Sequence, residues 1–273
     1  MNVKASVVLA TVTLTVAAAA APAVVRADSI TCHPYYDFCV EVDGKFPQDA
    51  RFLTAPDSHG RHVVDIPSQS VTFLIDMPAH KATALPRANV KQDGEAGLTV
   101  NTAVPGNTPS FAIAVEGPQI RFETSNAKVR VLKVLDRPPV IGPIAFDALI
   151  ADRMEYREGM KKYTPDSVAM ESLKSTKKPV EIEAYFATWC PHCLAYMPKL
   201  LRVLQDAHNP NLKVSLCGVP KNFGTEKGPW EGKNIQNIPA ILVRYEGKDV
   251  TRLGIQEGAV PEVELAGILN VLK

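Results

Sequence analysis

The spacing of hydrophobic and polar positions changes near the middle of the chain. In the first half, short segments alternate apolar and polar residues, as in Lys128-Val129-Arg130-Val131. A period of two is typical of strands with one face in water. Clusters of Pro, Gly, Asn and Asp separate the segments, as turns do. The strands this pattern predicts most clearly span residues 38–42, 70–76, 110–115, 119–124 and 128–135. Residues 28–137 are therefore expected to form an all-β domain, for which a sandwich is one candidate form.

A proline-rich segment, residues 138–143, marks the boundary with a second region, residues 144–273. Prolines interrupt backbone hydrogen bonding, and apolar residues recur at helical spacing beyond them. Thr164-Pro165 predicts an N-cap and the first position of a helix that ends near residue 174. Strands are predicted at 180–186, 213–219, 240–245 and 249–254, and further helices at 194–204 and 265–272. This mixture predicts an α/β domain.

The first 27 residues have the pattern of a secretory signal peptide. Lys4 supplies a positive start, residues 7–25 are apolar apart from threonines and Pro22, and Val25-Arg26-Ala27 fits a cleavage site. An uncleaved anchor helix is the alternative, since the apolar run approaches the ~20 residues that span a bilayer. The alanine content and Pro22 favour cleavage after Ala27. The protein is therefore expected to be exported, to the periplasm or the extracellular space.

Charge and cysteine content narrow the function classes. Thirty basic residues against 29 acidic ones leave a net charge of +1, and no basic run is present. A nucleic-acid partner is therefore not expected. Five cysteines are present in a chain expected to leave the cytoplasm, where thiols oxidise. Close spacing predicts two pairs, Cys32 with Cys39 and Cys190 with Cys193, and leaves Cys217 over.

Cys190-Pro191-His192-Cys193 lies between a predicted strand and a predicted helix. A cysteine at a helix N-terminus is exposed to unpaired N–H groups and to the positive end of the helix dipole, which stabilise its thiolate. We therefore expect Cys190 to be the nucleophile, Cys193 to resolve the mixed disulfide, and His192 to favour the Cys190 thiolate. Two alternatives stay open. One is a non-catalytic binding protein with a structural Cys190–Cys193 disulfide. The other is a metal chaperone using Cys190, Cys193 and Cys217.

Further residues around this motif are similar to those of the thioredoxin-like superfamily. The matching features, in chain order, are Phe186-Ala187-Thr188-Trp189-Cys190, Pro198, Ile238-Pro239, Gly247 and Gly254. The Pro-His dipeptide resembles that of DsbA-type periplasmic oxidants, whereas the compact layout is closer to exported thioredoxin or TlpA-like proteins. The resemblance implies an α/β thioredoxin-like fold, preceded by a smaller all-β domain, and thiol–disulfide oxidoreductase activity.

The resemblance also implies roles for individual residues. A cis Pro239 would face Cys190, the Ile238 backbone would pair with a substrate strand, and Trp189 would cover the site. Partners would be protein thiols or disulfides and a redox partner protein, with no cofactor. The chain departs from the family at Ala184, where a buried acid is usual. Glu183 should face the opposite side of its strand unless a bulge turns it inward, and Glu181 is a poorer substitute.

The N-terminal region carries weaker candidates. Cys32 and Cys39 are expected to close a structural disulfide, with a second redox pair as the alternative. His33, beside Cys32, has metal-ligand chemistry, and so do Asp57, His59 and His62, which are more simply solvated loop residues. The β-rich region is expected to mediate dimerisation or substrate capture.

Overall fold

The computed structural model describes residues 29–56, 59–94, 96–253 and 258–272. The expected signal peptide lies outside the described residues, as do Asp57 and Gly254. Within the described part of the chain, no helix combines the length and apolar character needed to cross a membrane.

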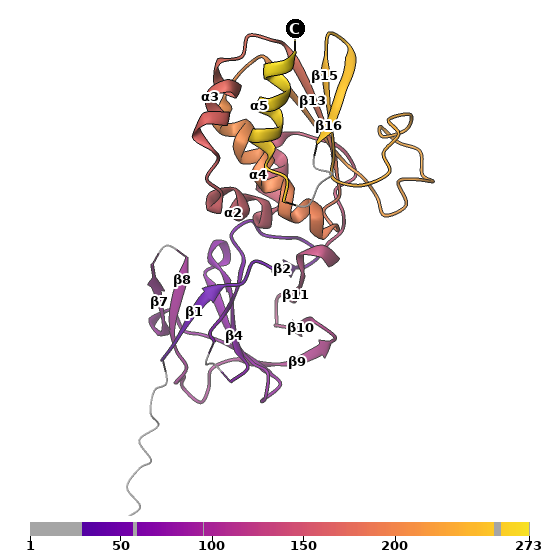
Figure 1. Cartoon of the computed structure of the whole chain (residues 1–273). Coiled ribbons are helices and arrows are strands. Elements are labelled where there is room, and N and C mark those ends of the chain that lie inside the picture. Colours follow the sequence, from indigo (N-terminus) through magenta and orange to yellow (C-terminus); the bar gives the residue numbers. More distant parts are fainter. Residues whose placement is uncertain (1–28, 57–58, 95, 254–257, 273) are drawn as a thin grey trace, which may run out of the picture.

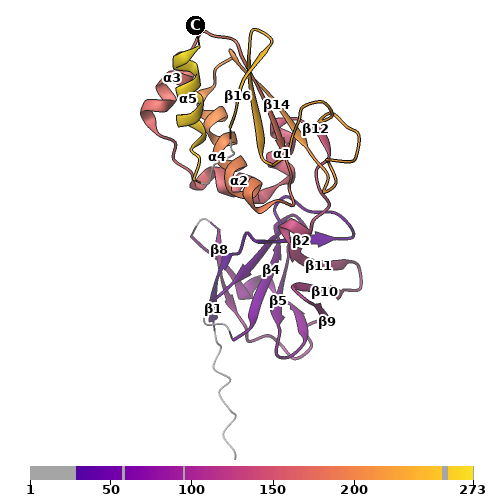
Figure 2. The same cartoon turned by 45° about the vertical axis from the view of Figure 1, so that its right-hand side comes forward.

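The first region is built from strands alone, apart from three short 3-10 turns. Its strands are β1 (Ser29–Pro34), β2 (Phe38–Val42), β3 (Arg51–Thr54), β4 (Arg61–Ile66), β5 (Val71–Asp76), β6 (Lys81–Ala84), β7 (Val90–Asp93), β8 (Gly97–Asn101), β9 (Ser110–Glu116), β10 (Gln119–Glu123) and β11 (Lys128–Lys133). They form one curled antiparallel sheet in the order β2-β11-β10-β9-β6-β5-β4-β3-β1-β8-β7 (Figures 1 and 2). The order is not that of the chain, since β1 lies between β3 and β8.

The central strands of this sheet are buried on both faces. Phe52 and Val64 belong to one hydrophobic cluster, and their neighbours Leu53 and Val63 belong to another. Because successive residues of a strand point to opposite faces, the two clusters lie on opposite sides of the sheet.

The second region combines a smaller sheet with five helices. Its elements are β12 (Gly142–Ile144), α1 (Phe146–Asp152), α2 (Met154–Lys162), α3 (Ser167–Ser175), β13 (Val180–Phe186), α4 (Pro191–Ala207), β14 (Leu212–Gly218), β15 (Ala240–Tyr245), β16 (Lys248–Leu253) and α5 (Pro261–Val271). The sheet order is β12-β14-β13-β15-β16, with β13 and β14 parallel and the other pairs antiparallel. Met197, Leu200 and Leu201 of α4 are fully buried in its core. Each such side chain contributes roughly 1.5–3 kcal/mol to folding.

The fold class predicted from the sequence is wrong. An α/β thioredoxin-like fold with a smaller, separate all-β domain was expected, with a sandwich as a candidate form, whereas the described residues are mostly β, in an eleven-stranded sheet and a five-stranded sheet. The two regions are also joined by side-chain contacts. The guanidinium of Arg157 donates to the carbonyl of Gln48 at 3.0 Å, and Leu194 of α4 packs against the cluster of Cys39 and Leu132.

The start of α3 also differs from the prediction. Asp166, and not Thr164, caps the helix, and its carboxylate accepts a hydrogen bond from the backbone N–H of Ala169 at 2.8 Å. Glu262 in turn accepts from the backbone N–H of Asp166 at 2.8 Å. A carboxylate at the N-cap satisfies an otherwise unpaired helix N–H, so Asp166 displaces the weaker threonine cap.

Gly218, at the end of β14, is packed against the proline-rich segment. A Cβ atom at this position would lie 2.2 Å from the carbonyl oxygen of Val140. We expect Gly218→Ala to lower the free energy of unfolding by about 1–3 kcal/mol, because the backbone must move to accept the methyl group. Gly224→Ala is the matched control, since nothing lies within 4 Å of a Cβ there. Equal urea midpoints for the two variants would contradict this packing.

Candidate functional site

The Cys-Pro-His-Cys motif lies where β13 is followed by α4. Cys190 is the N-cap residue of the 17-residue helix, and Pro191 occupies its first turn. Proline suits this position because its ring presets the helical φ and its missing N–H would have no partner there. Cys193 therefore falls in the first turn, with its side chain directed inward.

The two sulfurs differ in their surroundings. Cys193 has no exposed surface, whereas Cys190 is 6% exposed. The Cys193 sulfur accepts a hydrogen bond from the backbone N–H of Ala187 at 3.3 Å. The Cys190 sulfur lies 3.8 Å from the carbonyl oxygen of Ile238, and the Ile238–Pro239 peptide bond is cis. Residues 48 positions apart in sequence thus meet at Cys190.

The local electrostatics separate the two thiols. A hydrogen bond from Cys193 is the main cause that lowers the pKa of Cys190 to about 6; burial opposes it, and the backbone of Cys193 and His192 and the charge of His192 assist. The pKa of Cys193 is raised, by its hydrogen bond to Cys190 and by burial. At neutral pH Cys190 is therefore a thiolate, which can attack a disulfide, and Cys193 is a thiol. Disulfide exchange requires this difference between the two cysteines.

Side-chain and backbone contacts hold the segment before Cys190 in place. The indole N–H of Trp189 donates to the carbonyl of Val219 at 3.1 Å, and Trp189 is half-buried. The hydroxyl of Thr188 accepts from the backbone N–H of Val140 at 3.2 Å. His192 is exposed beside the two cysteines. The nearly buried Cys190 sulfur is therefore flanked in sequence by the exposed imidazole of His192 and the half-buried indole of Trp189.

Glu183 faces away from the cysteines, as strand alternation predicts. Its carboxylate binds Lys233 at 2.6 Å and Arg244 at 3.4 Å. Burial alone would raise its pKa, but hydrogen bonds from Lys233 and Tyr185 outweigh burial and lower it. The β13 ladders are regular, and the bulge in this sheet lies at Val243/Arg244, between β15 and β16. The Glu183 carboxylate therefore forms its ion pairs on the face of β13 opposite to the cysteines.

The expected disulfide between Cys32 and Cys39 is not formed. Both thiols are free and buried, Cys32 in the cluster around Leu53 and Cys39 in the cluster around Leu132. The first pairs with Leu98 on β8 and the second with Leu132 on β11, at distant positions of the sheet. The intervening turn directs the two strands to different partners, which sequence spacing alone does not reveal. Burial raises the pKa of Cys32 to about 11.

The remaining metal-ligand candidates are dispersed. Among the described residues, no group of three or more His, Cys, Asp or Glu side chains is placed to hold a metal ion. Cys217 is buried on β14 and is not brought together with Cys190 and Cys193 into such a group. His62 lies on β4, and its ring centroid is 5.1 Å from that of Phe52. Burial lowers the pKa of His62.

Sequence reasoning missed a buried polar cluster at the start of α2. Arg153, Glu155 and Tyr156 are 2%, 7% and 0% exposed. The guanidinium of Arg153 lies 2.9 Å from the carboxylate of Asp152 and donates to the carbonyl of Pro138 at 2.6 Å. The alternation of charged and apolar residues in this stretch resembles that of a surface helix, so its burial had no sequence signature.

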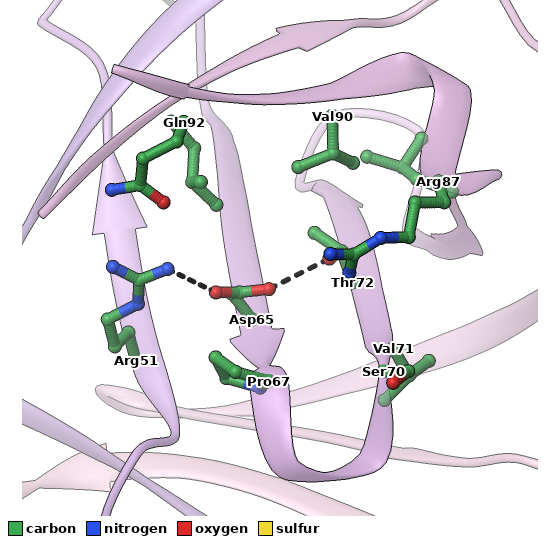
Figure 3. Close-up of a pocket in the computed structure, with 11 residues that line it drawn as sticks. Arg51, Asp65, Pro67, Ser70, Val71, Thr72, Arg87, Val90 and Gln92 are labelled. Atoms are coloured by element: carbon green, nitrogen blue, oxygen red, sulfur yellow. Dashed lines mark hydrogen bonds and ion pairs between the residues drawn. The ribbon is translucent and has the colours of Figure 1, made fainter. Parts of the chain in front are cut away.

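The first region has a polar pocket of its own, of about 190 Å³ (Figure 3). Its centre is Asp65, whose carboxylate binds Arg51 at 2.5 Å and accepts from the hydroxyl of Thr72 at 2.8 Å. Arg87 and Gln92 line the same pocket. Both oxygens of the carboxylate have protein partners, so Asp65 links β3, β4 and β5 at this pocket.

Comparison with known proteins yields only weak likenesses. No protein-family model matches the chain, and no curated protein does. Among solved structures, a Pseudomonas aeruginosa protein of unknown function is 14% identical, with a TM-score of 0.34 over 43% of this chain and 81% of that one. An HIV epitope scaffold is 14% identical, with a TM-score of 0.35 over 44% and 83%.

A third solved structure, that of the alkylhydroperoxide reductase AhpF of Enterococcus faecalis, is 15% identical. Its TM-score is 0.30, over 43% of this chain and 52% of that chain. At these values the likenesses carry no argument about function.

Proposed function

We propose that the protein is a thiol–disulfide oxidoreductase that exchanges disulfides with protein thiols through Cys190 and Cys193. The observation that supports this best is the unequal pair of sulfurs at the start of α4. One is a nearly buried group, 6% exposed, with its pKa lowered to about 6, and the other is a thiol with no exposed surface, one helical turn away. A purely structural disulfide needs no such difference, because neither of its sulfurs has to ionise.

The chemistry proceeds in two exchanges. The Cys190 thiolate attacks one sulfur of a substrate disulfide, the substrate S–S bond breaks, and the departing thiolate takes up a proton. Cys193 then loses its proton and attacks the Cys190 sulfur, which releases the second substrate thiolate. Two electrons pass from the cysteine pair to the substrate, and the Cys190–Cys193 disulfide remains. The reverse sequence oxidises a pair of substrate thiols.

The neighbouring residues have roles in this proposal. The Ile238 carbonyl, 3.8 Å from the Cys190 sulfur, offers a backbone acceptor to an extended substrate segment. Pro239 and Trp189 shape the surface around the thiolate, and His192 adds a charge that lowers the Cys190 pKa. The similarity of the Cys-Pro-His-Cys and Ile-Pro motifs to the thioredoxin-like superfamily supports the same activity.

We also propose the substrates, the redox partner and the compartment of this reaction. The substrates are protein thiols and disulfides, a redox partner protein restores the starting state, and no diffusible cofactor takes part. Export by the signal peptide of residues 1–27 would place the chain in the periplasm or the extracellular space, where such exchange is useful.

Disulfide exchange with oxidised glutathione, measured in acid-quenched samples, tests this function. The reduced full chain is mixed with glutathione disulfide, quenched with acid, and analysed by mass spectrometry. The expected products are a glutathione adduct on Cys190, followed by a Cys190–Cys193 disulfide. Absence of both products at neutral pH, while the protein remains folded, would overturn the proposed function.

A further inference from the structure

Three side chains near the start of α2 have buried polar atoms without a hydrogen-bond partner in the described structure. These atoms are Nε and Nη1 of Arg153, Oε1 of Glu155 and the hydroxyl oxygen of Tyr156. Buried polar groups are nearly always paired, because an unpaired one costs about 1–3 kcal/mol. Three in one short segment therefore indicate either a buried water between them or a functional role.

This cluster belongs to α2, which packs against α4, the helix that carries Cys193. A Cβ at Gly159 of α2 would lie 2.7 Å from Cβ of Pro198, and the guanidinium of Arg202 donates to the carbonyl of Met160 at 3.4 Å. Met160 follows Gly159 in α2, and its partner Arg202 follows Pro198 in α4, so the two helices run in the same direction. Tyr156, one turn before Gly159, is consequently level with the start of α4.

The environment of Tyr156 agrees with this placement. Its ring centroid is 6.1 Å from that of Phe186, at the end of β13, and it shares a hydrophobic cluster with both active cysteines. Its hydroxyl has a raised pKa, chiefly from burial, and among charged neighbours Cys193 has the largest effect, followed by Glu155. Cys193 and Glu155 are thus the two groups whose charges act most strongly on this hydroxyl.

Cys193 needs a proton acceptor at this place. To attack a mixed disulfide it must become a thiolate, yet it has no exposed surface from which solvent could take the proton. The backbone N–H of Ala187 only donates to its sulfur. Of the two acids on β13, Glu183 is held by Lys233 and Arg244 on the other face, and Glu181 also lies near Arg244, at 3.8 Å.

We propose that Tyr156 and Glu155 carry the proton away from Cys193 during the second exchange. The inference rests on the proposed function of the cysteine pair. A bridging water takes the proton of the Cys193 thiol and passes one to the Tyr156 oxygen, while the tyrosine hydroxyl passes its own proton, through a second bridging water, to the Glu155 carboxylate. The Cys193 thiolate then forms the S–S bond with Cys190, and the proton leaves Glu155 for solvent afterwards. In the reverse reaction Glu155 returns a proton to Cys193.

The charges around Glu155 are suited to this task. Burial raises the pKa of its carboxyl; a backbone hydrogen bond and the charges of Arg153 and Arg137 lower it, and Asp152 raises it. Cys39, on β2, is the remaining titratable group that interacts with Glu155. A carboxylate with a raised pKa binds a proton more readily than an ordinary one, and the charges of Arg153 and Arg137 favour the release of that proton.

A single-turnover experiment isolates the step. Reduced full chain is mixed with oxidised glutathione between pH 5 and pH 9, and acid-quenched samples give separate rates for adduct formation on Cys190 and for its resolution by Cys193. We expect Tyr156→Phe and Glu155→Gln to slow resolution at least about tenfold near pH 7 and to leave adduct formation unchanged. Glu155→Gln should also remove an inflection from the pH profile of resolution, which Glu155→Asp should keep.

Two variants serve as matched controls. Tyr196→Phe removes another buried hydroxyl, which is paired with Glu264 at 2.9 Å, and Glu183→Gln removes the acid on β13. Both should resolve the adduct with the wild-type pH profile.

The failures of the two proposals are distinguishable. If the wild type forms no adduct, the proposed function is wrong. If the wild type resolves its adduct and both test variants do so with the same pH profile, or with rates lowered equally at every pH, Tyr156 and Glu155 carry no proton. Should Tyr156→Phe fail to fold, the comparison of Glu155→Gln with Glu155→Asp still decides the question.

Discussion

Cys190→Ser should lose thiol–disulfide exchange altogether, whereas Cys193→Ser should accumulate mixed disulfides. The first variant lacks the thiolate that opens the reaction, since a serine hydroxyl does not ionise at neutral pH. The second keeps that thiolate but lacks the sulfur that releases the bound substrate. Exchange by Cys190→Ser should fall to the uncatalysed rate between small thiols and disulfides.

Mass spectrometry under non-reducing conditions measures both outcomes. Samples incubated with oxidised glutathione should show one adduct per chain in Cys193→Ser and none in Cys190→Ser. Cys217→Ser is the control, because Cys217 is buried on β14 away from the pair and should behave like the wild type. Accumulation of adducts in Cys190→Ser, and not in Cys193→Ser, would reverse the roles assigned to the two sulfurs.

The second large effect concerns the pH at which Cys190 becomes reactive. Its alkylation by iodoacetamide should have a midpoint near pH 6, against about 8.5 for an ordinary thiol. Removing the thiol donor in Cys193→Ala should shift the midpoint up the most, because that hydrogen bond is the main cause of the low pKa. His192→Ala should shift it up less.

The same shift makes the stability of the reduced protein depend on pH. A thiol with a pKa lowered on folding stabilises the native state fully above its unfolded value of about 8.5. This contribution is lost as the pH falls through about 6. Urea unfolding of the reduced wild type, compared with Cys190→Ser, should therefore show a stability difference that shrinks between about pH 8.5 and pH 6. A pH-independent difference, or an alkylation midpoint near about 8.5, would contradict the thiolate assignment.

Local patterns predicted some elements closely. The expected strands 38–42, 180–186 and 240–245 coincide with β2, β13 and β15. These are runs of β-branched or aromatic residues between clear turn signals, where strand preference and burial act together. The position of the cysteine pair at the start of a helix was predicted for a similar reason, because a strand, a Cys-x-x-Cys sequence and an amphipathic helix follow one another along a short stretch of the chain.

The extent of the large sheet could not be read in this way. Strands β3 and β4 are buried on both faces. Phe52-Leu53 and Val63-Val64 therefore lack the alternation of apolar and polar residues that indicates a strand with one face in water. The neighbours of β1 are β3 and β8, and β8 is far from β1 in the sequence. Such pairings depend on long-range packing, and so did the separation of Cys32 from Cys39.

The buried polar cluster of α2 escaped detection for a related reason. Arg153 and Glu155 have the composition of a solvated helix face, yet both are buried, and α2 packs against α4 and contacts the first region. An orphan hydroxyl such as that of Tyr156 is visible only once the surrounding side chains are placed.

The central claim, that Cys190 and Cys193 are a reversible redox pair, is tested most directly by an equilibrium titration of the full chain. The protein is incubated across a series of reduced-to-oxidised glutathione ratios, and the fraction with a Cys190–Cys193 disulfide is measured after acid quenching. We predict a single transition from two thiols to one disulfide, approached equally from the reduced and the oxidised protein. A disulfide that persists across the whole series, or a pair of thiols that never oxidises, would contradict the account.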